Sequence, residues 1–233
     1  MAMLLCIETS SVNCSVSLFN KGRLIACREA SRGYSHAEKL HPFIQEILEE
    51  SGIKTKEIQG IVLGAGPGSF TGLRIGSAAS KGLCFALNIP LITIPSLKNM
   101  AMSVRSNADQ LNLDQKFVLC PMIDARRMEV YCAQFDQDLN QISEAKPLIL
   151  DESTFSDQLS KEKIVFFGDG MNKMKGFYEN HSNAVFVEEI LPTSKVMAEM
   201  AEKKFLEKDF EDVAYYEPFY LKGFQATTPK KLI

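Results

Sequence analysis

The sequence predicts an α/β protein of two lobes, in which each lobe opens on antiparallel strands and continues with alternating helices and strands. Three observations support this. Strand patterns crowd residues 3–29, a glycine-rich turn separates a short apolar strand from a long helix, and the strand pattern restarts after a polar stretch at 106–115. With 233 residues, 45% of them hydrophobic, the chain is long enough for a core in each lobe.

The first half predicts the first lobe, residues 1–105. Apolar or alternating runs predict strands at 3–8, 14–19, 23–29, 60–63 and 91–94. Apolar residues at helical spacing predict helices at 35–50, from the glycine turn to about 87, and at 96–104. Pro42 predicts a kink or a helix start close to it, and Ser96 is the expected N-cap of the third helix.

The second half predicts a smaller lobe, residues 106–233. Its expected strands are 116–123, 130–135, 148–150, 164–167 and 185–187. Its expected helices are 154–160, one after the Gly168-Asp169-Gly170 turn, and an amphipathic helix over 192–206. The polar tail 222–233 is expected to be mobile.

Composition excludes several classes of protein. The net charge of −3 lacks the basic excess that nucleic-acid binding needs. No apolar run is long enough for a membrane helix, and the N-terminus resembles a first strand rather than a signal peptide. The six cysteines have no CxxC spacing and there are three histidines, so we expect free thiols, no metal site and a cytoplasmic location.

The glycine-rich turn is the most informative stretch, with six of the 14 glycines between Gly64 and Gly82. A strand, a glycine turn and a helix N-terminus form a natural anion site, because unpaired N–H groups and the helix dipole point at the ligand. The turn matches neither the dinucleotide fingerprint nor the P-loop. A tight strand-to-helix turn with no ligand is an equally good interpretation.

Small residues also line one face of the helix after this turn, at Gly72, Gly76, Ala79 and Ser80. Glycine inside a helix destabilises it by about 1 kcal/mol relative to alanine, so another backbone is expected to approach closely. That backbone belongs either to this chain's own helix 35–50 or sheet, which is slightly favoured, or to a partner subunit. In the partner interpretation, Gly76→Leu abolishes the complex and leaves the fold nearly intact.

Three motifs resemble one known family. They are Ile7-Glu8-Thr9-Ser10, the run from Gly66 to Gly76 (GPGSFTGLRIG), and the run from Asp124 to Tyr131 (DARRMEVY). Gly168-Asp169-Gly170 and the run from Glu217 to Leu221 (EPFYL) add to the match. Over about residues 3–222 the chain resembles the bacterial TsaB (YeaZ) family. The resemblance implies the ribonuclease H-like, actin-like ATPase fold shared with sugar kinases and Hsp70, with a reduced second lobe.

The resemblance also implies a function. Such a chain would be a non-catalytic scaffold that binds the TsaD-like threonylcarbamoyltransferase, and with it the TsaE-like ATPase, for modification of N6 of adenosine 37 in tRNA. It implies a heterodimer with TsaD, a homodimer when alone, indirect contact with tRNA and no contact with a membrane. No cofactor would be required, although weak ATP or ADP binding is possible.

Residues at the matched positions explain the expected lack of catalysis. The catalytic relative carries an Asp-Glu pair just after its first motif, where this chain has Val12 and Asn13. A valine neither ligates a cation nor takes a proton. His36 and His41 are five residues apart, which is the wrong spacing for a helical metal pair. We interpret His36 as capping or solvated, His41 as helix surface and His181 as loop.

Two sets of candidate residues follow, with no catalytic and no metal-ligating residue among them. The possible nucleotide- or anion-binding residues are Glu8, Gly66, Gly68, Ser69, Asp124, Arg126, Gly168 and Asp169. The possible partner-interface residues are Leu40, Ile44, Ile47, Gly72, Ile75, Gly76, Ala79 and Ser80. For Asp124 and Arg126 an ion pair or turn bond at a strand end is the preferred interpretation, and Asp169 alternatively is a helix N-cap.

Two other functions remain open. The first is a nucleotide-binding ATPase or phosphotransferase, for which Glu8 and Asp124 are the only well-placed carboxylates. A peptidase is least favoured, because the sequence has neither a Gly-x-Ser-x-Gly elbow nor an HExxH motif. The basic pair Lys230-Lys231 in the tail could contact RNA.

Overall fold

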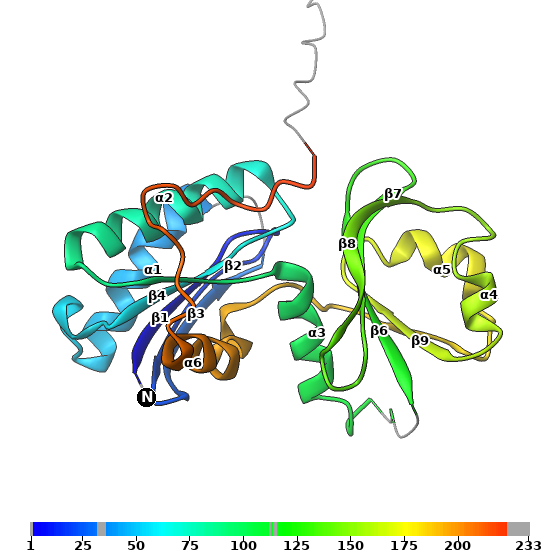
Figure 1. The fold of residues 1–233 in the computed structure, drawn as a ribbon, viewed down its shortest axis with the longest axis horizontal. Helices are drawn as coiled ribbons and strands as arrows, with labels where there is room; N and C mark the ends of the chain where they lie inside the picture. The colour runs from blue at the N-terminus through cyan, green and yellow to red at the C-terminus, as the bar shows by residue number, and fades with distance from the viewer. Residues whose placement is uncertain (1, 32–35, 112, 114–115, 223–233) are drawn as a thin grey trace, which may run out of the picture.

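The computed structural model describes residues 2–31, 36–111, 113 and 116–222. It consists of two five-stranded mixed sheets side by side, each covered by helices (Figure 1). The expected mobile tail 222–233, including Lys230 and Lys231, lies outside the described residues except for Lys222. Within the described ranges, no helix is both long and apolar enough to cross a membrane.

The first sheet has the strand order β3-β2-β1-β4-β5. Its strands are β1 (Met3–Glu8), β2 (Cys14–Asn20), β3 (Arg23–Ala30), β4 (Gly60–Gly64) and β5 (Leu91–Ile94). The first three are antiparallel, and β4 and β5 run parallel to β1. The predicted opening meander is therefore confirmed.

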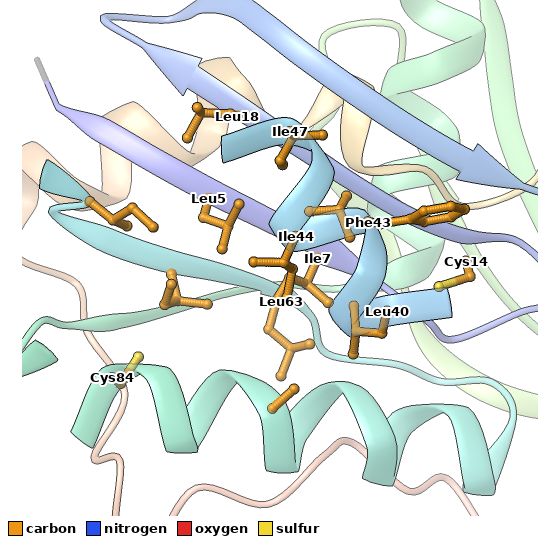
Figure 2. Close-up of a cluster of buried hydrophobic side chains, with 14 of the residues drawn as sticks. Leu5, Ile7, Cys14, Leu18, Leu40, Phe43, Ile44, Ile47, Leu63 and Cys84 are labelled. Carbon is orange, nitrogen blue, oxygen red and sulfur yellow. The ribbon is translucent and has the colours of Figure 1, made fainter. Parts of the chain in front are cut away.

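Helices cover both faces of this sheet, which explains why β1 is apolar from Met3 to Ile7. Helices α1 (His36–Ser51) and α2 (Phe70–Leu87) pack on the face that carries Leu5 and Ile7 (Figure 2). Helix α6 (Ala198–Glu207) packs on the opposite face, against Leu4 and Cys6. Helix α1 begins six residues before Pro42, so the expectation of a helix start close to the proline is wrong.

The second sheet, in the order β10-β9-β6-β7-β8, repeats the topology of the first. Its strands are β6 (Phe117–Asp124), β7 (Glu129–Phe135), β8 (Gln141–Ile149), β9 (Lys163–Phe167) and β10 (Ala184–Val187). Helix α3 (Ser96–Ser106) packs on one face, and α4 (Ser156–Leu159) and α5 (Asn172–Tyr178) on the other. Strand β8 is longer than expected because it is an edge strand whose exposed side chains are mostly polar.

The packing differs from the expected division at residue 105. Helix α3 packs through Leu97 and Met100 against the second sheet, while α6 returns to the first sheet near the end of the chain. The expected helix 192–206 is also divided. A 3-10 turn, Ser194–Val196, precedes α6, because Thr193 is extended and Ser194 is bonded to the side chains of β2. The only other 3-10 turn among the described residues is Thr55–Glu57.

Candidate functional site

The glycine-rich turn after β4 is braced by close contacts with other parts of the chain. Gly66 has a φ of +97°, and a Cβ there would lie 2.9 Å from the carbonyl oxygen of Phe219. A Cβ on Gly68 would overlap the carbonyl group of Ser10. The Gly66 N–H donates to Ser96 Oγ at 3.1 Å, and the Ser96 N–H donates to the Gly66 carbonyl at 2.8 Å. Ser96 is thus the first residue of α3, and it holds the turn through two hydrogen bonds to Gly66. Its expected role as N-cap is wrong, because Pro95 occupies that position.

The N-terminus of α2 is also satisfied from within the chain. Ser69 is its N-cap, and its Oγ accepts the Gly72 N–H at 3.3 Å. The Ser69 N–H donates to the Ser10 carbonyl at 2.6 Å. These contacts account for Gly66, Gly68 and Ser69 as parts of a tight strand-to-helix turn, without requiring a bound anion.

Glu8 ends β1 beneath this turn and is fully buried. Its Oε1 accepts the Ser10 N–H at 2.6 Å, and its carboxyl group lies where a side chain on Gly64 would be. Its Oε2 has no hydrogen-bond partner among the described residues. Burial raises the pKa of Glu8, although bonds from Ser10 and Thr9 oppose this. The carboxyl group is thus enclosed by the chain, with one oxygen already engaged by the Ser10 N–H.

The second-lobe candidates form a separate hydrogen-bonded group at the end of β6. The Asp124 N–H donates to Asp169 Oδ1 at 2.8 Å, and Asp124 Oδ1 accepts the Arg126 N–H at 2.6 Å. Asp124 Oδ2 pairs with Lys173 Nζ at 2.9 Å. The bond from the Arg126 N–H is the turn bond that the sequence favoured for this pair, whereas the ion pair is made with Lys173, which the sequence did not indicate. Burial raises the pKa of Asp169. Its carboxylate accepts the Asp124 N–H and does not cap α5.

Gly168 and Arg126 have backbone roles in this group. Gly168 has a φ of +101°, and a Cβ there would overlap the carbonyl oxygen of Met122. Arg126 and Arg127, with φ of +68° and +45°, form the tip of the β6–β7 hairpin. Over residues 2–31, 36–111, 113 and 116–222, no hydrogen bond or ion pair joins the first-lobe candidates to the second-lobe ones. In that part of the chain, no three His, Cys, Asp or Glu side chains are grouped to hold a metal ion.

The expected partner-interface residues lie mostly inside the first lobe. Leu40, Ile44 and Ile47 of α1 pack onto the sheet (Figure 2). On α2, the buried residues include Gly72, Gly76, Ala79 and Ser80, while Ile75 is partly buried against the same core. These side chains therefore pack against the chain itself, which is the alternative slightly favoured for the small residues of α2, and their role at a partner interface stays a prediction.

Thr9 explains why the inner face of α2 needs glycine. A Cβ on Gly76 would overlap Thr9 Oγ1, and a Cβ on Gly72 would overlap the Thr9 carbonyl oxygen. The Thr9 hydroxyl donates to the Gly72 carbonyl at 2.8 Å. His36 also packs here. It is 2% exposed and bonded through Nε2 to the Ser11 carbonyl at 2.8 Å, so its expected solvated or capping role is wrong.

Because a Cβ on Gly76 would overlap Thr9 Oγ1, Gly76→Leu would disturb the fold itself.

The opposite, outward face of α2 was missed by the sequence analysis. It carries Thr71, Arg74, Ala78, Gly82 and Phe85, all exposed. Phe85 is 87% exposed, and a Cβ on Gly82 would meet nothing within 4 Å. The Arg74 guanidinium lies 4.3 Å from the Phe70 ring centroid. The signal was present in the sequence, because Ala78, Gly82 and Phe85 have helical spacing.

A groove lies along the second half of α1 and the turn after it, and Leu83 of α2 contributes to its lining. The groove is open to solvent and has a volume of ≈ 620 Å³. It is lined by His41, Ile44, Gln45, Leu48, Glu49, Gly52, Ile53, Lys54, Thr55 and Leu83.

Comparison with known proteins adds a family match. The model of the family described as "TsaD: tRNA N6-adenosine threonylcarbamoyltransferase" matches residues 25–229. Two curated relatives are named "tRNA threonylcarbamoyladenosine biosynthesis protein TsaB". The one from Escherichia coli is 33% identical, over 94% of each chain. The one from Haemophilus influenzae is 30% identical, over 98% of this chain and 96% of that protein.

Solved structures support the fold. YeaZ from Pseudomonas aeruginosa matches with a TM-score of 0.74 at 24% identity, covering 95% of this chain and 100% of that one. An inorganic polyphosphate/ATP-glucomannokinase from an Arthrobacter strain matches with a TM-score of 0.50 at 12% identity, covering 89% of this chain and 100% of that one. The expected two-lobed, actin-like α/β fold is thereby confirmed.

Proposed function

The chain belongs to the TsaB (YeaZ) family, and from this premise we propose that it is a non-catalytic scaffold subunit in tRNA threonylcarbamoyladenosine biosynthesis. In this proposal it binds a TsaD-like threonylcarbamoyltransferase as a heterodimer and, through that complex, a TsaE-like ATPase. The complex rather than this subunit contacts the tRNA. The chain alone forms a homodimer, requires no cofactor, and binds ATP or ADP at most weakly.

The observation that carries the proposal is the outward face of α2. Ala78 and Gly82 leave the helix backbone open to close approach by a partner helix. Phe85 projects beside them, 87% exposed, as a large aromatic anchor of the kind that dominates binding interfaces. Gly72 and Gly76 on the inner face are already covered by the chain itself. The outward face is therefore the one left for a partner.

The carboxylates support a non-catalytic role. Phosphoryl transfer needs a carboxylate that is free to hold Mg²⁺ or to activate a nucleophile. Glu8 is fully buried with Oε1 bonded to the Ser10 N–H, and Asp124 is engaged by Lys173 and by the Arg126 N–H. Asn13, at a position where the catalytic relative has an acid, donates through Nδ2 to the Pro192 carbonyl at 3.0 Å, which is a structural role.

The test is size-exclusion chromatography with light scattering, using this chain alone and mixed with the TsaD-like protein of the same source. The wild type is expected to form a 1:1 heterodimer that replaces any homodimer. Gly82→Arg places a charge on the outward face, where its Cβ meets nothing within 4 Å, and should weaken the complex at least about 100-fold. Gln141→Arg, at an exposed position of β8, is the matched control.

Two outcomes would contradict the proposal. Failure of the wild-type chain to form a complex would remove the scaffold role. A complex that survives Gly82→Arg as well as Gln141→Arg would place the interface elsewhere. Equal melting temperatures of the two variants establish that a lost complex reflects the interface rather than unfolding.

A further inference from the structure

The segment from Glu211 to Lys222, which we call the C-terminal strap, follows α6 and runs over the first lobe toward the second (Figure 1, orange to red). At its start the Glu211 N–H donates to the Leu91 carbonyl at 2.9 Å, forming a bridge beside β5. Farther along, the Phe219 N–H donates to the Ala65 carbonyl at 2.8 Å, just after the end of β4. Backbone hydrogen bonds therefore fix the strap to the first lobe at two points.

A cavity of ≈ 780 Å³, open to solvent, lies between the strap and the first lobe. The lobe contributes Ala65 and Thr93 to its lining. The strap contributes four aromatic side chains and three carboxylates, those of Glu211, Asp212 and Glu217. None of the residues that line this space is basic. The cavity therefore combines ring faces with negative charge.

The three carboxylates form no ion pair within the described ranges. Glu211 accepts the Thr93 hydroxyl at 2.6 Å, and Asp212 Oδ1 accepts the Ala214 N–H at 2.8 Å. Both bonds come from neutral donors, so they leave the negative charge in place. Glu217 is exposed and has no hydrogen bond within those ranges. A ligand that supplies a positive charge would therefore find carboxylate oxygens still to be paired.

The basic side chains that reach the strap are engaged with other groups. Lys81 of α2 donates to two backbone carbonyls of the strap, both at 3.1 Å. Lys222 Nζ pairs with the Glu129 carboxylate at the start of β7. Burial raises the pKa of Tyr216, and the charge of Glu211 raises it further, as expected where the potential is negative. The cavity therefore favours a cation and disfavours an anion.

The aromatic side chains indicate the kind of cation. Tyr215 is 84% exposed and Phe219 47%, so their rings are accessible to a ligand. Tyr216 Oη is buried without a hydrogen-bond partner among the described residues, which costs free energy until a donor reaches it. A guanidinium group suits all of these features, because it stacks on rings, binds carboxylates through two N–H groups at once and carries five donors.

We propose that the cavity under the C-terminal strap is a docking site for an arginine side chain of a partner protein. The guanidinium stacks on Tyr215 and donates to Glu217 and Glu211. The occupant is a protein side chain because the cavity is open, whereas small-molecule sites enclose most of their ligand, and because tyrosine and arginine are enriched at protein interfaces. The site goes beyond the scaffold function and does not depend on it, since the outward face of α2 takes no part in it.

Titration of the full-length chain with a capped Gly-Arg-Gly peptide, followed by NMR, tests the site. The peptide should shift the amide signals of residues 211–220. The matching peptide with neutral citrulline in place of arginine has nearly the same shape and should bind at least about tenfold more weakly.

Variants of the chain locate the binding. Glu217→Gln should weaken binding of the arginine peptide at least about fivefold, and Tyr215→Ala about threefold. Glu144→Gln removes an exposed carboxylate from β8, is the matched control and should leave the affinity unchanged. Glu217 and Tyr215 are both exposed, so neither change removes a core contact, and unchanged amide spectra outside the strap verify the fold.

Three outcomes would overturn the proposal. The first is equal affinity for the arginine and citrulline peptides. The second is wild-type affinity for the arginine peptide in Glu217→Gln. The third is tighter binding of spermidine than of the arginine peptide, because the cavity would then be a site for a free polyamine and not for a protein side chain.

Discussion

Helix α2 presents small residues on two opposite faces, and within the described residues one of those faces is buried against the chain while the other is exposed. The inner face places Gly72 and Gly76 against Thr9 so closely that no side chain fits. The outer face places Ala78 and Gly82 in the open, next to an exposed Phe85. Small residues at helical spacing therefore indicate close approach, but the spacing does not say whether the approaching backbone belongs to the same chain.

The largest expected effect contrasts the two glycines directly. Gly76→Leu should lower the free energy of unfolding by about 3 kcal/mol, because its Cβ would overlap Thr9 Oγ1 and crowd Leu63. Gly82→Leu should leave stability within about 1 kcal/mol of the wild type, with a gain favoured by helix propensity. Urea denaturation of both variants measures this. Equal losses in the two variants would remove the distinction between the faces.

A second prediction sharpens the role of the outer face. Phe85→Ala should weaken the complex with the TsaD-like partner by about 2 kcal/mol, or roughly 30-fold, and leave unfolding unchanged. Ile149→Ala, which removes another exposed hydrophobic side chain (71% exposed) from the second lobe, is the control. Calorimetry would measure both affinities. An affinity loss shared by both variants would point to a general effect instead of an anchor.

A third comparison uses threonine on each side of α2. Thr9→Val removes the hydroxyl that donates to the Gly72 carbonyl at 2.8 Å inside the lobe, and should destabilise the fold by about 1 kcal/mol. Thr71→Val, on the exposed outer face, should change stability by less than about 0.5 kcal/mol. Thermal denaturation distinguishes the two. If Thr71→Val is the more damaging change, the inner contact is not what holds the helix.

Local patterns predicted much of the fold and little of its long-range arrangement. The opening meander and helices α1 and α2 follow from periodicity and from the turn residues between them. The return of α6 to the first sheet has no local signal, because Met197 and Ala201 are apolar whichever lobe they cover. The extent of β8 was missed because an edge strand with polar side chains lacks the apolar run that predicts a strand.

The candidate sites show the same limit. The sequence identified Glu8, Asp124 and the glycine turn as notable, but their partners come from distant parts of the chain. Lys173 reaches Asp124, and Phe219 reaches the turn from near the end of the described residues. Such pairings depend on how the sheets and helices are placed in space. A single sequence can therefore identify a notable residue, but it does not identify the distant partner that decides the role of that residue.

The smallest expected effect is a pH dependence at Glu8, which precedes Thr9 in the segment that α2 packs against. Burial raises the pKa of Glu8 above 4.5, so the folded state binds its proton more tightly than the unfolded state. The stability due to this group is complete below pH 4.5 and is lost as pH rises through the folded-state pKa. Glu8→Gln keeps an oxygen to accept the Ser10 N–H but does not titrate. Urea denaturation from pH 4 to 7 should therefore show wild-type stability falling relative to Glu8→Gln as pH rises; parallel curves would mean that the buried carboxyl group does not resist ionisation.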